Sequence, residues 1–178
     1  MDRLDEIRDY LKAFQNRWIA KKVRECAGQP EEELLEKTEQ VLSDAKERFC
    51  FLCLFHFRSS LVEGTYEYWI CALGKMMYLQ PPIAQGIWVP QKLYEDVPDL
   101  RRETERELRK RFIRLQTYEV EEGVRGILEE YQKLAEVYWF EAAQRAAAGE
   151  RFRSAPKEEE WKILSGSYMG SLKIVLQP

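Results

Sequence analysis

Residues 50–57 read Cys-Phe-Leu-Cys-Leu-Phe-His-Phe and form the longest apolar run in the chain. Apolar residues at helical spacing lead into this run, among them Leu34, Val41 and Phe49. Pro30 precedes them, and proline is common at the first position of a helix. The acidic residues that follow Pro30 are favourable at a helix N-terminus. We therefore expect one helix from Pro30 into this run, with its last two turns buried on every face.

Similar periodicity predicts helices on both sides of this segment. An apolar stripe that includes Ile7 and Leu11 covers residues 3–26, and Gly28 follows it as a stop signal. Residues 116–118 contain neither Pro nor Gly, so the sequence leaves open whether the last two expected helices are continuous. The other expected helices cover residues 65–73, 99–115 and 119–148.

The remaining segments lack helical periodicity. Residues 74–98 are rich in Pro and Gly but keep many large apolar side chains, which predicts an irregular crossing segment packed over the helices. Two short apolar stretches flank a glycine-containing loop within residues 161–176, which predicts a small hairpin leaning on the core. The expected fold class is mainly α, a bundle of about four long helices plus short helices with a small C-terminal β-hairpin. We expect a single helical domain over residues 1–178, with residues 1–149 forming the bundle.

The amino-acid composition excludes some classes of protein. The 178 residues are 45% hydrophobic and 33% charged, with a formal net charge of −3. A chain of this length buries about 70% of its unfolded surface and folds without a metal or a disulfide. The apolar and aromatic content excludes a disordered chain, and the charge balance argues against a wholly basic nucleic-acid or membrane-surface protein. The composition therefore predicts a soluble globular protein.

The compartment is inferred from the N-terminus and the cysteines. No apolar run approaches the ~18 residues that cross a bilayer, so no membrane partner is expected. Residues 1–6 mix charges where a secretory signal would place a basic stretch before an apolar one. We therefore expect a cytoplasmic protein. Its four cysteines, Cys26, Cys50, Cys53 and Cys71, are expected to be reduced and mostly buried.

Cys50-x-x-Cys53-x-x-His56 is the most suggestive pattern for metal or catalysis. On a helix, steps of three residues would group two thiols and an imidazole, which are zinc ligands. A fourth ligand would have to come from Cys26 or Cys71, because His56 is the only histidine. A cysteine or serine nucleophile paired with that histidine also needs an electropositive setting, which this apolar run does not provide. The interpretation favoured is core packing, with no metal and no cofactor.

Other chemical motifs are weak. No Walker, Rossmann or His-Glu-x-x-His motif is present, and the glycines at 166 and 170 fit a hairpin turn better than a phosphate cradle. Glu67 stands among Tyr66, Tyr68 and Trp69 and is the carboxylate best placed for an aromatic pocket. A solvated charge on a short helix is the simpler interpretation of Glu67. The sequence therefore favours a protein that is not an enzyme.

Basic residues gather in two segments, the end of the first expected helix and the stretch 101–114. Together they offer contacts for about half a dozen phosphates. Glutamates three or four residues away also pair with many of these cations within a helix. A solvated, self-paired face is the interpretation favoured over a nucleic-acid surface. The candidate basic patch consists of Arg17, Lys21, Lys22, Arg24, Arg101, Arg102, Arg106, Arg109, Lys110, Arg111 and Arg114.

Aromatic residues and methionines concentrate between residues 66 and 94. Such side chains supply large, adaptable contact area, so this segment is the best candidate for a pocket or a partner groove, although covering the core would also explain it. The candidate residues are Glu67, Tyr68, Trp69, Met76, Met77, Tyr78, Trp88 and Tyr94.

Three functions remain open from the sequence. The favoured one is a non-catalytic protein-interaction or regulatory module that binds a protein partner or its own copy, through residues 66–94 or the face around Leu108 and Phe112. The second is nucleic-acid binding through the basic patch. The third is a small ligand-binding protein or enzyme with an aromatic pocket near Glu67 and Trp88.

Overall fold

The computed structural model describes residues 2–26 and 29–178, which form two compact units. The first unit contains the described residues up to position 26 together with Gln91–Leu134. The second contains residues 29–90 and Ala135–Pro178. Gly28, the expected stop signal of the first helix, lies outside the described residues.

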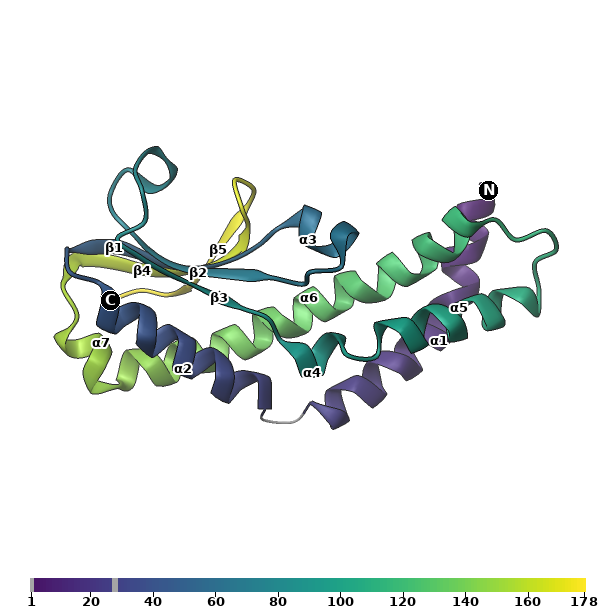
Figure 1. Cartoon of the computed structure of the whole chain (residues 1–178), viewed down its shortest axis with the longest axis horizontal. Coiled ribbons are helices and arrows are strands. Elements are labelled where there is room, and N and C mark those ends of the chain that lie inside the picture. The colour runs from purple at the N-terminus through teal and green to yellow at the C-terminus, as the bar shows by residue number, and fades with distance from the viewer. Residues whose placement is uncertain (1, 27–28) are drawn as a thin grey trace. The chain divides into compact units, whose positions relative to one another are not determined.

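The first unit is helical (Figure 1). Its elements are α1 (Arg3–Glu25), α4 (Gln91–Tyr94), α5 (Val97–Arg109) and the first part of α6 (Thr117–Ala148). The helices predicted over residues 3–26 and 119–148 are confirmed, and α5 and α6 are separate because α5 ends at Arg109. Helix α6 lies so close to α1 and α5 at Gly123 that a Cβ there would come within 2.6 Å of the Leu11 side chain.

The second unit combines helices with a sheet. Its strands pair in the order β3-β2-β1-β4-β5, and only the β1–β4 pair is parallel. The elements, in chain order, are α2 (Gln29–Asp44), β1 (Phe49–His56), α3 (Arg58–Glu63), β2 (Tyr68–Leu73), the 3-10 helix η1 (Met77–Leu79), β3 (Ala84–Trp88), the rest of α6, α7 (Glu150–Ser154), β4 (Lys157–Ser167) and β5 (Leu172–Leu176).

The predicted helical bundle is wrong, because the run at residues 50–57 is the central strand of this sheet and not the end of a helix. A strand covered on both faces is apolar at every position, just like a buried helical turn, so composition did not distinguish the two. The expected helix over residues 65–73 contains β2 instead, and the irregular segment 74–98 contains β3. The C-terminal hairpin exists as β4 and β5, but it extends the sheet rather than leaning on a bundle.

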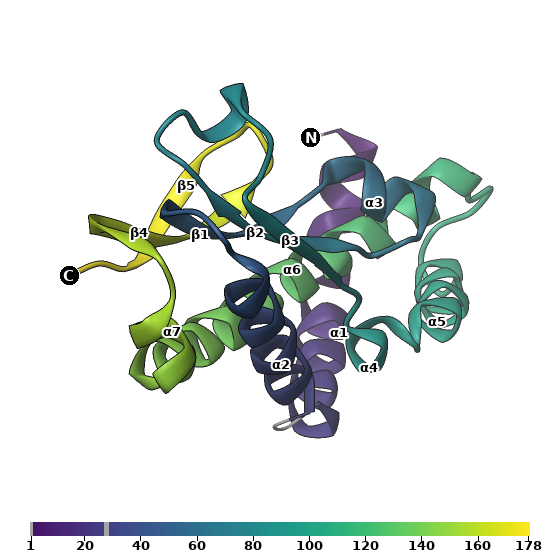
Figure 2. The ribbon, with the colours of Figure 1, turned by 60° about the vertical axis from the view of Figure 1, so that its left-hand side comes forward.

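Helices cover one face of the sheet (Figures 1 and 2). Helix α2 packs closely at Gly86 of β3, where a Cβ would meet Val41 at 3.2 Å. From α6, the Trp139 indole donates a hydrogen bond of 3.0 Å to the Leu164 carbonyl of β4. The segment around η1 and the β4–β5 turn rise from the opposite face, which we call the helix-free face.

Candidate functional site

Five aromatic rings form a connected cluster on the helix-free face. Phe55 lies at its centre, with its ring centroid 5.7 Å from Tyr78, 5.7 Å from Tyr168 and 5.8 Å from Trp69. Phe57 extends the cluster, at 5.4 Å from Tyr168. Most of these pairs are tilted or edge-to-face, the geometries that aromatic rings prefer. The cluster therefore joins β1, β2, η1 and the β4–β5 turn over the sheet.

A buried layer lies beneath these rings. Cys53, Cys71, Leu73 and Leu164 form it together with Phe55, and each of them is at most 5% exposed. The Tyr78 hydroxyl is buried. Burial raises the pKa of Tyr78, so this hydroxyl stays protonated and adds no charge to the cluster.

Large apolar side chains are exposed around the cluster. Leu79 in η1 is 82% exposed, and Met169 in the β4–β5 turn is 70% exposed. Met76 precedes η1 and is also exposed. Two sheet residues belong to the same face, Ile87 opposite Trp69 and Ile174 opposite Leu164, and both are exposed. The helix-free face thus presents an apolar rim around an aromatic centre.

The structure separates the residues that the sequence grouped as one pocket. Trp69 belongs to the helix-free face, and Met77 and Tyr78 pack against the same cluster. Tyr68 and Trp88 are buried cross-strand partners whose rings lie 5.2 Å apart, and strand alternation places Tyr68 on the other face from Trp69.

The two remaining pocket candidates, Glu67 and Tyr94, are not part of the aromatic cluster. Glu67 is exposed and not enclosed by aromatic rings, and its backbone carbonyl accepts a hydrogen bond of 3.4 Å from Ser60. Tyr94 belongs to the first unit, where its ring packs 5.6 Å from that of Tyr131.

Sequence reasoning missed Phe55, Phe57, Tyr168 and Met169. The helix predicted through residues 50–57 includes the first two, and a helix does not place alternate residues on one face. Phenylalanines at positions 51, 55 and 57 with a cysteine at 53 alternate with period two, which is the signal of one strand face. Tyr168 and Met169 carried no such signal, because a turn brings them to the cluster.

The basic candidates from Arg101 to Lys110 all pair with neighbouring carboxylates. Arg109 pairs with Glu105 at 2.6 Å, and Lys110 pairs with Glu107 at 2.6 Å. Further ion pairs join Arg101 to Glu121, Arg102 to Asp99 and Arg106 to Glu103. Arg111 lies over the Tyr10 ring at 5.4 Å. This pattern is that of a self-paired helix face.

Lys22 is not a surface cation. Its side chain is 1% exposed and its ammonium lies 3.0 Å from the Asp96 carboxylate. Asp96 also accepts a hydrogen bond from Tyr131, whose hydroxyl accepts one of 2.8 Å from Trp18. These four side chains form a closed polar network that ties α1 to the start of α5 and to α6. Because each polar group has a partner, the network fits a structural role.

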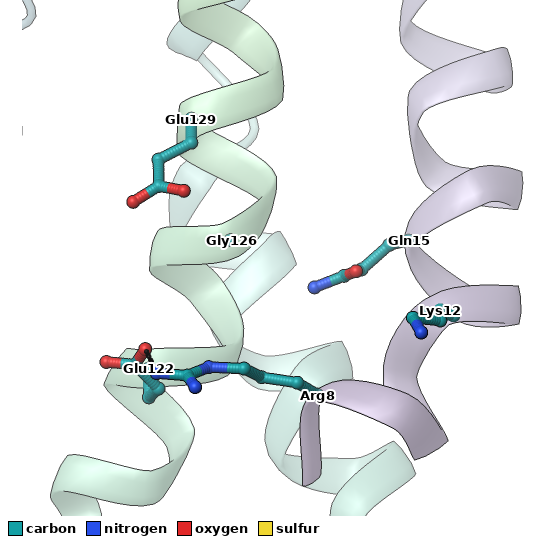
Figure 3. Close-up of a pocket in the computed structure, with 6 residues that line it drawn as sticks. All are labelled: Arg8, Lys12, Gln15, Glu122, Gly126 and Glu129. Carbon is teal, nitrogen blue, oxygen red and sulfur yellow. Dashed lines mark hydrogen bonds and ion pairs between the residues drawn. The ribbon is translucent and has the colours of Figure 1, made fainter. Parts of the chain in front are cut away.

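A polar groove lies between α1 and α6 in the first unit (Figure 3). Its volume is about 300 Å³, and Arg8 of α1 and Glu122 of α6 bridge it at 2.7 Å. Its other lining residues are Lys12, Gln15, Gly126 and Glu129. The groove carries both signs of charge, and two of its charged side chains, Arg8 and Glu122, already pair with each other.

The Cys50, Cys53 and His56 side chains do not converge. Alternation along β1 places Cys53 on the helix-free face and both other side chains on the opposite face. Among residues 2–26 and 29–178, no group of three His, Cys, Asp or Glu side chains is arranged to hold a metal ion. Burial lowers the pKa of His56. The zinc geometry that a helix would have created is therefore not formed.

Comparisons with protein-family models, curated proteins and solved structures find no match to this chain. Within the part of the chain that the structure describes, no helix is both long and apolar enough to cross a bilayer.

Proposed function

We propose that this chain is a non-catalytic protein-interaction module and that the helix-free face is its docking surface. The observation that carries the proposal is the exposed apolar rim of Met76, Leu79 and Met169 around the aromatic cluster. Large apolar side chains exposed on one face of a folded protein are typical of interaction sites.

The composition of the face supports a protein partner. Three of the four methionines of the chain, Met76, Met77 and Met169, belong to it, together with Trp69, Tyr78 and Tyr168. Methionine and aromatic residues are enriched at the centres of protein interfaces, and charged residues are depleted there. The partner that fits is an apolar segment of another protein, whose side chains would cover the rim and contact the rings.

Two alternatives have less support. Nucleic-acid binding would use the basic patch, but its cations from Arg101 to Lys110 pair with carboxylates, and Lys22 is buried beside Asp96. An enzyme pocket at Glu67 and Trp88 would need these side chains to converge, but Glu67 is exposed and Trp88 is buried.

Affinity capture with matched variants tests the docking surface. The triple variant Met76→Ser, Leu79→Ser, Met169→Ser removes the rim while leaving the buried layer intact. Val137 and Phe140 of α6 are also exposed apolar residues of the second unit, so Val137→Ser, Phe140→Ser is the control. We expect proteins captured by the unmodified chain to be lost at least about tenfold from the rim variant and retained by the control, because each lost anchor weakens binding by about 1 kcal/mol or more.

Equal capture by the rim variant and the unmodified chain would refute the proposal. Light scattering on the same three proteins shows whether the bound partner is a second copy of the chain, since self-association through this face would also disappear in the rim variant alone.

We also propose a cytoplasmic location. The four free, buried cysteines support it, because free thiols are usual in a reducing compartment.

A further inference from the structure

Two cysteines face each other across the centre of the sheet. In the antiparallel β1–β2 pair, Cys53 and Cys71 are direct partners, between the pairs Leu52–Ala72 and Leu54–Ile70. Residues directly opposite in such a pair have Cα atoms about 4.5 to 5.5 Å apart and point to the same face. A disulfide needs a Cα separation of about 4.4 to 6.8 Å. The register therefore supplies the geometry for a cross-strand disulfide.

We propose that Cys53 and Cys71 form a redox-convertible dithiol, which a low-molecular-weight disulfide oxidises to an intramolecular cross-strand disulfide in the folded protein. The inference rests on the strand register and is independent of the docking function. Cys26 belongs to the other compact unit, and Cys50 is on the opposite face of β1, so neither competes for this pair.

The surroundings make the reaction slow but selective. Both thiols are fully buried under the aromatic cluster. Burial and the neighbouring thiol of Cys53 raise the pKa of Cys71, so little thiolate forms while the cover is closed. The cover includes η1, whose residues are at most partly buried, and segments with few buried contacts open most readily. Oxidation is thus expected to follow opening of the segment around η1.

The chemistry balances with one oxidant molecule. A thiolate of the pair attacks one sulfur of the external disulfide, forms a mixed disulfide and releases the first small thiol, which takes up the proton. The second protein thiol loses its proton and attacks the protein sulfur of the mixed disulfide, releasing the second small thiol. The dithiol is oxidised by two electrons and the external disulfide is reduced to two thiols.

The test uses the full-length native chain incubated with oxidised glutathione, with dithiothreitol-treated protein as reference. After acid quenching, intact mass spectrometry should show the loss of two hydrogens and no glutathione adduct. Trypsin cleaves after Arg58 and Lys75, so peptides 49–58 and 59–75 should be joined without reduction. The thermal midpoint should rise by about 5 °C, because the bond closes a loop in the unfolded chain.

The Cys50→Ala variant identifies the partner, because Cys50 and Cys53 share one tryptic peptide. The cross-link should form in this variant as it does in the unmodified chain. Loss of the cross-link in Cys50→Ala, its formation only in denaturant, or a thermal midpoint that does not rise would each overturn the proposal.

Discussion

Glu119 combines burial with hydrogen bonding at the start of α6. Its side chain is 1% exposed, and it accepts a hydrogen bond of 2.7 Å from the Gln116 backbone N–H and contacts Arg3. A glutamate that reaches back to the residue before the helix is half of a capping box. Burial by itself would raise the pKa of this carboxyl, but the Gln116 and Arg3 hydrogen bonds prevail and hold it below its usual value.

Replacing Glu119 with Gln should destabilise the protein by about 1 to 2 kcal/mol at pH 7, since one charge-assisted hydrogen bond is lost. The lowered pKa means that the stabilisation is present above the unfolded-state pKa and is lost as pH falls through the folded-state pKa. The difference in unfolding free energy between the two proteins should therefore shrink below about pH 4. Urea unfolding at several pH values measures this difference.

Glu121→Gln is the matched control, because Glu121 is 40% exposed and pairs with Arg101 on the surface. Its effect should stay within about 0.5 kcal/mol at every pH. A Glu119→Gln penalty that does not change with pH would contradict the role of the carboxylate charge.

The packing of α6 against its neighbours depends on one of two glycines in the helix. At Gly123, a Cβ would lie 2.6 Å from Leu11 and 3.0 Å from Thr104, both fully buried side chains of α1 and α5. At Gly126, the nearest contact would be the flexible end of Gln15 at 2.8 Å. Replacement by alanine should therefore lower the stability of the protein at Gly123 but not at Gly126.

We expect Gly123→Ala to destabilise the protein by about 1 to 2 kcal/mol, because crowding of a packed core outweighs the gain in helix propensity. Gly126→Ala should be neutral or stabilising by up to about 1 kcal/mol, because Gln15 can move. Thermal or urea unfolding of both variants measures the effects. Equal effects at the two positions would contradict the close approach of the three helices.

Sequence periodicity predicted the type of secondary structure correctly where one side of the element is exposed to solvent. The stripes of α1 and of α6 predicted these helices, because charged residues mark the exposed side. The run in β1 has no solvated side, so its apolar residues fitted a helix and a buried strand equally. Its pairing with β4 depends on residues more than a hundred positions later, which local patterns do not record.

Only part of the candidate docking face was predictable from the sequence, because some of its residues are far apart in the chain. Trp69, Met76, Met77 and Tyr78 were found from composition alone, since they cluster in sequence. Tyr168 reaches them only through the β4–β5 turn. Lys22 was assigned to a basic surface because only the fold places Asp96 beside it.

At the scale of the whole molecule, β1 holds the second unit together. It pairs with β2 on one side and with β4 on the other, so it joins the antiparallel β1–β3 meander to the C-terminal hairpin. Edge strands lack a partner on one side, and β3 and β5 are the edges of this sheet. Opening of β1 requires separation from both neighbours, whereas an edge strand can open by separating from one.

Native-state hydrogen exchange should therefore rank the strands. Amides of β1 should exchange slowest, at least about tenfold more slowly than those of β3 and β5, because their opening approaches global unfolding of the sheet. Mass spectrometry of peptides covering residues 49–58, 84–88 and 172–176 gives the ranking within one sample, so protein concentration and pH are matched internally. Exchange of β1 as fast as that of the edge strands would contradict the central position of the strand.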